Sequence, residues 1–194
     1  MAQPGRGKGR IVRNVVFFDV ETQRTADEVG GWENAAKMGV SVAVTYSTLD
    51  GRYHVYEESD VPLLIEELFR ADVVVGFNIR TFDYAVLSRY SGRPLDPLPT
   101  LDLLEDVTRQ AGHRAKLDNL ARTTLGEGKS GEGLGAVGLF AEGRMLELVD
   151  YCRRDVEVTK GLYEYGVRHR RVQFTDMASG EVREIVVDWG HHGE

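Results

Sequence analysis

The stretch Val15-Val16-Phe17-Phe18-Asp19-Val20-Glu21-Thr22 decides the interpretation of this chain. Apolar and β-branched residues fill it as far as Asp19, which is typical of a strand buried on both faces. Asp19 and Glu21 are two positions apart, so on a strand their side chains point to the same face. Two like charges this close repel unless a cation lies between them, and ligands that are all oxygen suit Mg²⁺ or Mn²⁺ rather than Zn²⁺. The stretch therefore indicates either a metal site at the end of a strand or a strand that simply ends in acidic turn residues.

Size and composition are those of an ordinary globular protein. The chain has 194 residues, of which 42% are hydrophobic and 28% charged, enough for one domain with a sizeable core. No apolar run approaches the ~20 residues of a membrane helix, and the N-terminus has no hydrophobic signal segment. The single cysteine, Cys152, excludes an internal disulfide and a Cys-rich zinc site. We therefore expect a protein of the reducing cytoplasm with no membrane partner.

The charge distribution bears on partners. A formal net charge of −7 argues against a protein that coats nucleic acid non-specifically. It is compatible with a nuclease, because two bound divalent cations would offset about four of these charges. The basic residues gather in three clusters, at 6–13, 109–122 and 153–171, and each cluster is either a solvated face or a place of phosphate contact.

Hydrophobic periodicity and turn residues predict a mixed β-sheet flanked by helices. Asp50-Gly51 separates two β-rich runs, which is a strong hairpin signal. Strands are expected at about 11–20, 40–46, 53–56 and 71–76. Helices are expected at about 61–70, 81–90, 101–110, 116–125 and 145–169. The order of strand, hairpin, helix, strand and helices predicts a single-domain α/β fold.

The chain is expected to divide into three parts. Residues 1–10 are predicted to form a disordered basic tail, residues 11–170 the folded domain, and residues 171–194 a C-terminal β-hairpin and tail of the same domain. The segments 22–38 and 126–143 are predicted to be loops, each with a short helical piece.

Two further groups of polar residues accompany Asp19 and Glu21. Asn78 and Asp83 directly follow the second buried strand, and the carboxyl ends of strands are where α/β sheets place their sites. Asp83 would open a helix, where an acidic residue also compensates the helix dipole in the ordinary way. Tyr151 and Asp155 are four positions apart on the longest predicted helix and therefore share a face.

In this order, Asp-x-Glu, Asn-x-x-x-x-Asp and Tyr-x-x-x-Asp make the sequence resemble the DEDD superfamily of 3′–5′ exonucleases, in its tyrosine-bearing branch (DEDDy). The resemblance covers about residues 11–168. In detail the sequence is most similar to bacterial predicted-exonuclease domains and to the proofreading domain of family B DNA polymerases. It implies the ribonuclease H-like fold. It also implies hydrolysis of phosphodiester bonds at the 3′ ends of single-stranded DNA or RNA.

The resemblance also assigns roles to individual residues. Asp19 would bridge two divalent cations, Mg²⁺ or Mn²⁺, with Glu21 and Asp155 completing one site and Asp83 holding the second cation through water. Tyr151 would orient the attacking water, since a phenol with a pKa near 10 suits positioning better than proton abstraction. Contacts with the substrate are expected, with less support, from Thr22, Phe77, Asn78, Lys116 and Arg122.

Several features have other interpretations. Asp102 and Glu105 indicate a helix cap, with a lesser chance that Asp102 lies near the metals. Gly128-Lys129-Ser130 resembles the end of a P-loop, but Thr123 stands where that motif needs glycine, so ATP binding is rejected.

Two segments depart from the family pattern. Segment 22–38 is longer than a hairpin needs and could lie over the site. The hairpin beyond residue 170 has no counterpart in the family and could cover a sheet edge or bind a partner protein. The competing functions are a non-catalytic ribonuclease H-like module that binds nucleic acid or acts as a scaffold, and an endonuclease or resolvase of the same broad fold.

Overall fold

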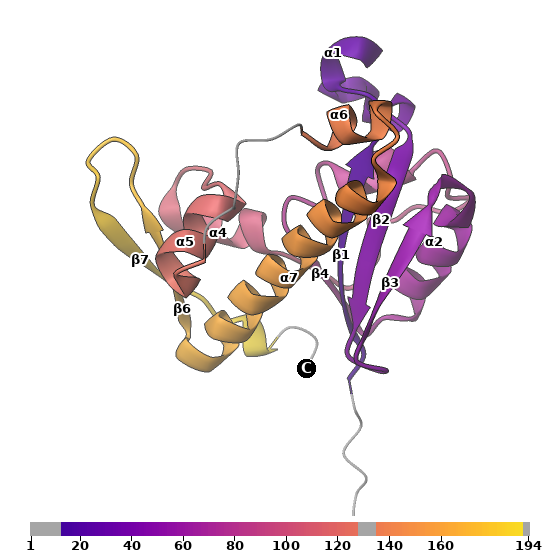
Figure 1. Cartoon of the computed structure of the whole chain (residues 1–194). Helices are drawn as coiled ribbons and strands as arrows, with labels where there is room; N and C mark the ends of the chain where they lie inside the picture. The colour runs from indigo at the N-terminus through magenta and orange to yellow at the C-terminus, as the bar shows by residue number, and fades with distance from the viewer. Residues whose placement is uncertain (1–12, 128–134, 192–194) are drawn as a thin grey trace, which may run out of the picture.

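The computed structural model describes residues 13–127 and 135–191 of the chain. Five strands form a mixed sheet in the order β3-β2-β1-β4-β5, and helices lie on both of its faces (Figure 1). The predicted α/β fold with a mixed sheet flanked by helices is confirmed. The expected tail 1–10 and the Gly128-Lys129-Ser130 segment lie outside the described residues.

The central strand of the sheet is the one quoted first. β1 pairs antiparallel with β2 and parallel with β4, so both of its edges are covered, as the continuous apolar run predicted. β2 and β3 form the predicted antiparallel hairpin, whose turn ends at Gly51 with a φ of 69°. β4 and β5 are parallel. The strands of this sheet are β1 (Val15–Thr22), β2 (Val40–Ser47), β3 (Arg52–Glu57), β4 (Val73–Gly76) and β5 (Thr100–Asp102).

The helices largely follow the periodicity of the sequence. The predictions for 61–70 and 145–169 agree with the structure, whereas the helix predicted for 81–90 is wrong in length. Only Asp83–Leu87 is α-helical there, because a three-residue turn from Tyr90 N–H to Leu87 O ends it before Gly92. The α-helices are α1 (Ala26–Val29), α2 (Val61–Arg70), α3 (Asp83–Leu87), α4 (Leu103–Ala111), α5 (Leu117–Leu125), α6 (Ala136–Ala141) and α7 (Met145–His169).

Segment 22–38 is more regular than the single helical turn predicted for it. Thr25 and Glu28 form a reciprocal capping box that starts α1, and the 3₁₀ helix η1 (Trp32–Lys37) follows. Two more 3₁₀ turns occur, η2 (Glu58–Asp60) and η3 (Trp189–His191).

Alternation along β1 separates two apolar cores. Phe17 packs in the core beneath α7, whereas Val16 and Phe18 pack in the core beneath α2 and α3. Because side chains two apart share a face of a strand, Asp19 and Glu21 lie on the face that α7 covers. This placement brings the acidic end of β1 toward the longest helix.

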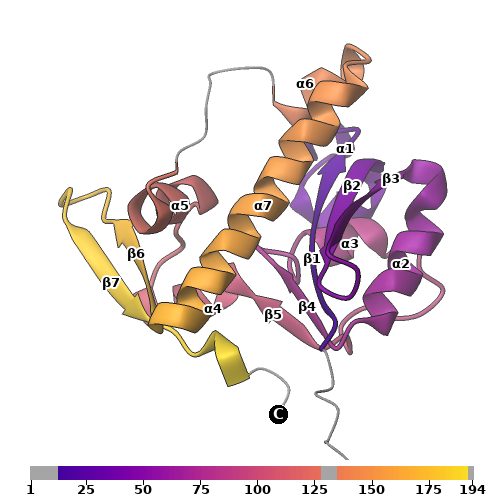
Figure 2. The ribbon, with the colours of Figure 1, turned by 60° about the horizontal axis from the view of Figure 1, so that its bottom comes forward.

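The C-terminal hairpin forms a separate two-stranded sheet, β6 (Arg171–Thr175) with β7 (Val182–Val186). The hairpin itself was predicted. Trp189, beyond the end of β7, is buried and donates its indole N–H to Asp106 Oδ2 at 2.7 Å. Figures 1 and 2 show the hairpin beside α5, away from the β3 edge of the main sheet. Within the described residues it pairs with neither edge strand of that sheet, so it does not extend the sheet.

No helix in the described part of the chain is long and apolar enough to span a membrane. The longest, α7, carries charged residues along its exposed side throughout its length.

Candidate metal centre

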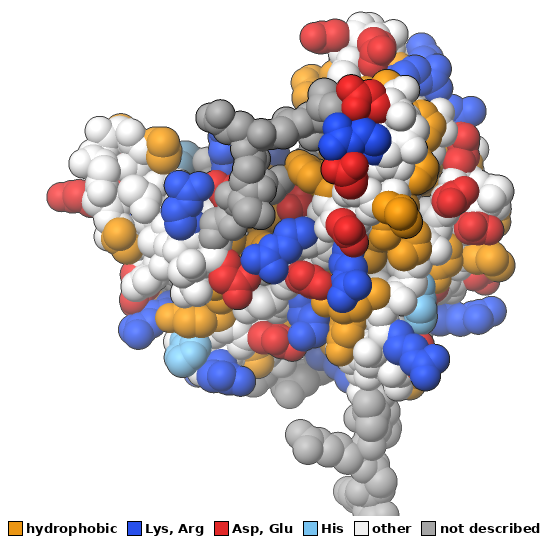
Figure 3. Space-filling view, viewed as in Figure 1, with side chains coloured by type: hydrophobic (Ala, Val, Ile, Leu, Met, Phe, Trp, Pro, Cys, Tyr) orange, Lys and Arg blue, Asp and Glu red, His pale blue; other side chains and the backbone are white. Residues whose placement is uncertain are grey.

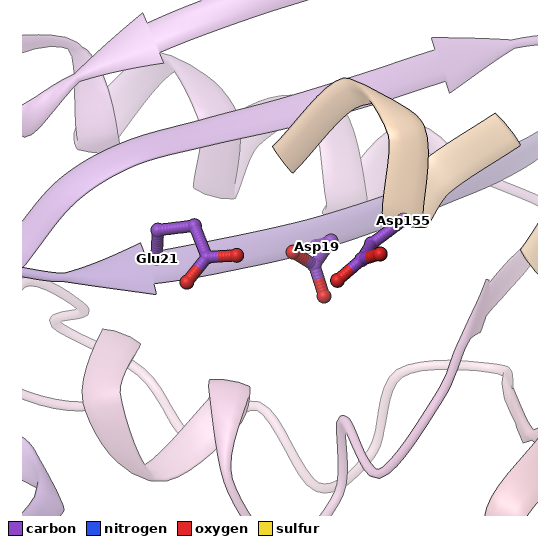
Figure 4. Close-up of side chains that lie close together, drawn as sticks. All are labelled: Asp19, Glu21 and Asp155. Carbon is purple, nitrogen blue, oxygen red and sulfur yellow. The ribbon is translucent and has the colours of Figure 1, made fainter. Parts of the chain in front are cut away.

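Three carboxylates converge where β1 meets α7. Oxygen atoms of Asp19, Glu21 and Asp155 lie within 4.8 Å of one another, and each of the three residues is half-buried. Figure 4 shows the first two on β1 and the third on the helix that crosses it. Carboxylates this close can share one hard cation. The structure therefore confirms that these three residues form a group able to hold a metal ion.

Helix α7 brings Asp155 to β1 through a contact that the sequence interpretation missed. The buried thiol of Cys152, three residues before Asp155, donates to the backbone oxygen of Asp19 at 3.4 Å and to its Oδ2 at 3.5 Å. Burial first, and then the charges of Asp19 and Glu21, raise the pKa of Cys152 well above its usual value. The thiol therefore stays protonated and acts as a donor. The only available signal was its spacing on the inner face of the predicted helix.

Asp83 lies beside this group rather than within it. As predicted, it opens a helix, but it is only 2% exposed, and its Oδ1 accepts a hydrogen bond from Val20 N–H at 3.0 Å. The register shared by β1 and β4 ends at Phe17 and Val75, so Asp83 satisfies a β1 donor beyond the end of β4. Burial, and next the charge of Asp19, raise the pKa of Asp83 well above its usual value.

Tyr151 is half-buried and packs against the core beneath α7. It lies one turn before Asp155 on the same helix, and residues four apart on a helix share a face. The predicted pairing of a phenol with a carboxylate on α7 is therefore compatible with the fold.

Asp102 holds the loop that leads from β4 to Asp83. Its carboxylate accepts main-chain hydrogen bonds from Leu104 at 3.0 Å and Glu105 at 3.3 Å, which makes it the cap of α4 as predicted. It also accepts from Asn78 N–H at 2.8 Å and Arg80 N–H at 3.0 Å. With four main-chain donors on its two oxygens, Asp102 is a positioning residue for the loop and not a member of the carboxylate group.

The remaining expected substrate residues have different surroundings. Thr22 is buried and its hydroxyl donates to Arg24 O at 3.0 Å, so that side chain is engaged within the fold. Phe77 is half-buried against the core. The amide oxygen of Asn78, a residue with a φ of 71°, accepts from Arg114 Nη2 at 2.8 Å. Asn tolerates this left-handed backbone better than most residues.

The long segment after β1 lies beside α3 instead of forming a plain loop. Trp32 of η1 is 70% exposed, and its ring meets Phe82 edge-on, with centroids 5.8 Å apart. Phe82 directly precedes Asp83, so the segment borders the same end of the sheet as the carboxylates. The contact leaves most of the Trp32 ring open to solvent.

The basic cluster on α7 belongs to a solvated face. Arg153 pairs with Glu157 at 3.0 Å, Arg154 with Glu127 at 2.9 Å, and Lys160 with a glutamate one turn on. Figure 3 shows blue and red side chains interspersed over this face. Cations neutralised by neighbouring carboxylates offer little attraction to phosphate.

No protein-family model matches the chain, and no curated protein matches it significantly. The chemistry of this centre is therefore inferred from the three clustered carboxylates, the buried Asp83 beside them and the helix that carries Tyr151.

Proposed function

We propose that this protein is a metal-dependent 3′–5′ exonuclease of the DEDDy type that hydrolyses phosphodiester bonds at single-stranded 3′ ends of DNA or RNA. One observation carries the proposal: Asp19, Glu21 and Asp155, from segments more than a hundred residues apart in the chain, place carboxylate oxygens within 4.8 Å. The strand order β3-β2-β1-β4-β5 is consistent with the ribonuclease H-like fold that such enzymes have.

The donor set fits a hard divalent cation. The clustered ligands are all carboxylate oxygens, which Mg²⁺ and Mn²⁺ prefer, whereas Zn²⁺ favours histidine and thiolate. The one thiol nearby, Cys152, is held in its protonated form by burial and by the neighbouring carboxylates, which raise its pKa. Cys152 is not among the residues whose ligand atoms converge, so oxygen ligation is what the residues support.

Each residue then has a physical task. Two divalent cations, one held by Asp19, Glu21 and Asp155 and the other by Asp19 and Asp83, would stabilise the attacking and leaving oxygens of an in-line displacement at phosphorus. Asp83 is fixed for this by its hydrogen bond from Val20 N–H. Tyr151, one turn before Asp155, would orient the attacking water.

A binding or scaffold module with the same fold is the competing function. Such a module has no use for a cluster of mutually repelling carboxylates, because charges this close destabilise a fold that has no cation to bind. The cluster thus favours the enzyme. An endonuclease of the same broad fold would also use carboxylates, and the polarity of cleavage separates it from an exonuclease.

The deciding experiment follows degradation of 5′-labelled single-stranded DNA and RNA of equal sequence with Mg²⁺, with Mn²⁺ and with a chelator. The proposal predicts a ladder that shortens from the 3′ end and disappears with the chelator and in Asp19→Asn. Asp96→Asn, which alters an exposed carboxylate in the loop before β5, is the matched control and should remain active. Internal cuts would indicate an endonuclease, and strand binding without cleavage would favour the scaffold module.

Cation binding can be measured without any substrate. A ligand that binds only the folded state stabilises it by about 2.7 kcal/mol at a concentration one hundred times its dissociation constant. Mg²⁺ or Mn²⁺ should therefore raise the melting temperature of the wild-type protein and leave that of Asp155→Asn nearly unchanged. An equal rise in both proteins would contradict the assignment of Asp155 as a ligand.

A further inference from the structure

A groove of about 770 Å³ separates α5 from the turn of the C-terminal hairpin. One wall is the segment that runs from His113 into α5, and the other is the end of β6 with the turn that follows it. Phe174 lies at the base, where it is buried and meets the edge of the His113 ring at a centroid distance of 5.1 Å. Met177 stands on the rim and is 86% exposed.

The groove carries an excess of positive charge. Its lining includes Arg114, Lys116 and Arg122 besides His113, against the carboxylates of Asp118 and Asp176. Arg122 forms an ion pair with Asp118, and Asp176 pairs with Arg183 at 3.2 Å while two turn N–H groups donate to it. Those hydrogen bonds lower the pKa of Asp176. Within the described ranges, Arg114 and Lys116 form no ion pair, so their charges are available to a ligand.

The two walls are fixed to each other before any ligand arrives. Asn119 and Thr175 exchange a pair of hydrogen bonds, both 2.8 Å long, between the amide side chain and the strand backbone. One turn later, the Thr124 hydroxyl donates to Gln173 O and accepts from Gln173 N–H, both at 2.8 Å. Binding of a ligand in the groove therefore loses little conformational entropy from the groove walls.

The groove is joined to the candidate metal centre by one hydrogen bond. Arg114, at the groove wall, donates to the Asn78 amide oxygen at 2.8 Å. Asn78 belongs to the loop that leaves β4 and reaches Asp83 five residues later, and Asp102 fixes that loop from below. The groove wall is thus linked to the loop that carries Asp83.

We propose that this groove binds the phosphate backbone of a single nucleic-acid strand, upstream of the 3′ end that reaches the carboxylates. The inference rests on the proposed exonuclease function and adds a second point of attachment, built jointly by α5 and the hairpin. Cationic side chains that follow a strand give affinity without base specificity and make it depend on salt. The C-terminal hairpin then acts as a clamp that holds longer strands in place.

Strand binding in the Asp19→Asn background, where cleavage cannot interfere, gives the first test. Fluorescence anisotropy of a labelled single-stranded DNA is followed as a function of salt. Lys116→Gln should reduce the slope of log K against log salt by about 0.7, the value for one phosphate contact on a single strand. Arg52→Gln, an exposed arginine on β3, should leave the slope unchanged.

The hairpin is tested by adding a negative charge to it at two exposed positions. Met177→Glu places a carboxylate on the groove rim and should weaken strand binding by about three- to tenfold at low salt. Val186→Glu adds the same charge to β7 at a side chain that is 69% exposed and outside this groove, and should leave affinity unchanged. Equal effects of the two substitutions, or binding of polyglutamate but not of the strand, would overturn the proposal.

Dependence on strand length separates this proposal from the catalytic one. For strands of about 15 nucleotides Met177→Glu should raise KM and leave kcat unchanged, whereas for strands of about 3 nucleotides it should change neither. Cleavage with no length-dependent effect would refute the groove and leave the exonuclease standing. Weakened binding by Met177→Glu in a protein that cleaves nothing would support the groove and refute the exonuclease.

Discussion

Replacing Asp102 by alanine and by asparagine tests how the loop beside the candidate metal centre is held. Oδ1 of Asp102 accepts from the main-chain N–H groups of Asn78, Leu104 and Glu105, and Oδ2 accepts from Arg80. Alanine removes all four acceptors. Asparagine keeps Oδ1 and turns an amide NH₂ group toward the Arg80 N–H, so it removes one acceptor and introduces a donor facing a donor.

The expected costs differ accordingly. Loss of the helix cap alone costs about 0.5–2 kcal/mol, and a buried donor left without an acceptor costs about 1–3 kcal/mol. Because the Asn78 and Arg80 donors are only partly buried, water can replace part of what they lose. Asp102→Ala should therefore lower the free energy of unfolding by about 3–5 kcal/mol, and Asp102→Asn by about 1–2 kcal/mol.

Urea-induced unfolding measures both values, with an unchanged m-value as the sign that only stability has altered. The ratio of the stability losses in the two variants is the more discriminating quantity, because it depends on which carboxylate oxygen accepts from which N–H group. Equal losses for alanine and asparagine, or a loss below about 1 kcal/mol for alanine, would refute the view that Asp102 anchors the loop. Strand cleavage by Asp102→Asn reports separately on whether loosening Arg80 disturbs the centre.

Three further outcomes follow from the same contacts. Asp83→Asn keeps the oxygen that accepts from β1 and removes an acid whose charged form burial disfavours. It should therefore abolish strand cleavage without lowering the melting temperature, and a loss of folding would contradict this. A Cβ on Gly166 would lie 2.2 Å from the Trp189 ring, so Gly166→Ala should lower the free energy of unfolding by about 1–3 kcal/mol, while Gly92→Ala, with open space around it and no left-handed backbone, serves as the steric control in urea unfolding. Hydrogen bonds from Tyr90 and Gln23 lower the pKa of Glu58, so its stabilising effect is present above the unfolded pKa of about 4.5 and is lost as pH falls through the lower folded pKa. Glu58→Gln should therefore flatten this part of the acid unfolding curve, and an unaltered curve would contradict the assignment.

The residues that could be predicted from the sequence are those whose position depends on local periodicity. A period of two along β1 put Asp19 and Glu21 on one face, and a period of 3.6 along residues 145–169 put Asp155 on the inner face of α7. The carboxylate group needed only that these two faces meet. That the two faces meet was implied by the resemblance to the DEDD exonucleases and not by periodicity.

What escaped prediction depends on tertiary registration. The burial of Asp83 follows from the pairing of β1 with β4, which ends at Phe17 and Val75. Val20 N–H therefore has no partner on β4, and Asp83 Oδ1 accepts its hydrogen bond instead. Likewise the groove exists because Asn119 bonds to Thr175, 56 residues away. Contacts between residues this far apart in the chain leave no periodic pattern in the sequence. The length of α3 was overestimated because its end also depends on such contacts.

The energetic cost of the centre bears on which function the fold serves. Two ionised carboxylates whose oxygens lie within 4.8 Å of each other repel by about 3 kcal/mol at an effective dielectric constant of about 20, and by less where water screens these half-buried groups. Compared with a typical unfolding free energy of about 5–15 kcal/mol, this repulsion is a substantial destabilisation for a protein that only binds strands. Replacing one member, as in Asp155→Asn, should therefore stabilise the cation-free protein and remove its response to Mg²⁺. A gain in stability together with a loss of the Mg²⁺ response is expected of a metal centre and not of a scaffold.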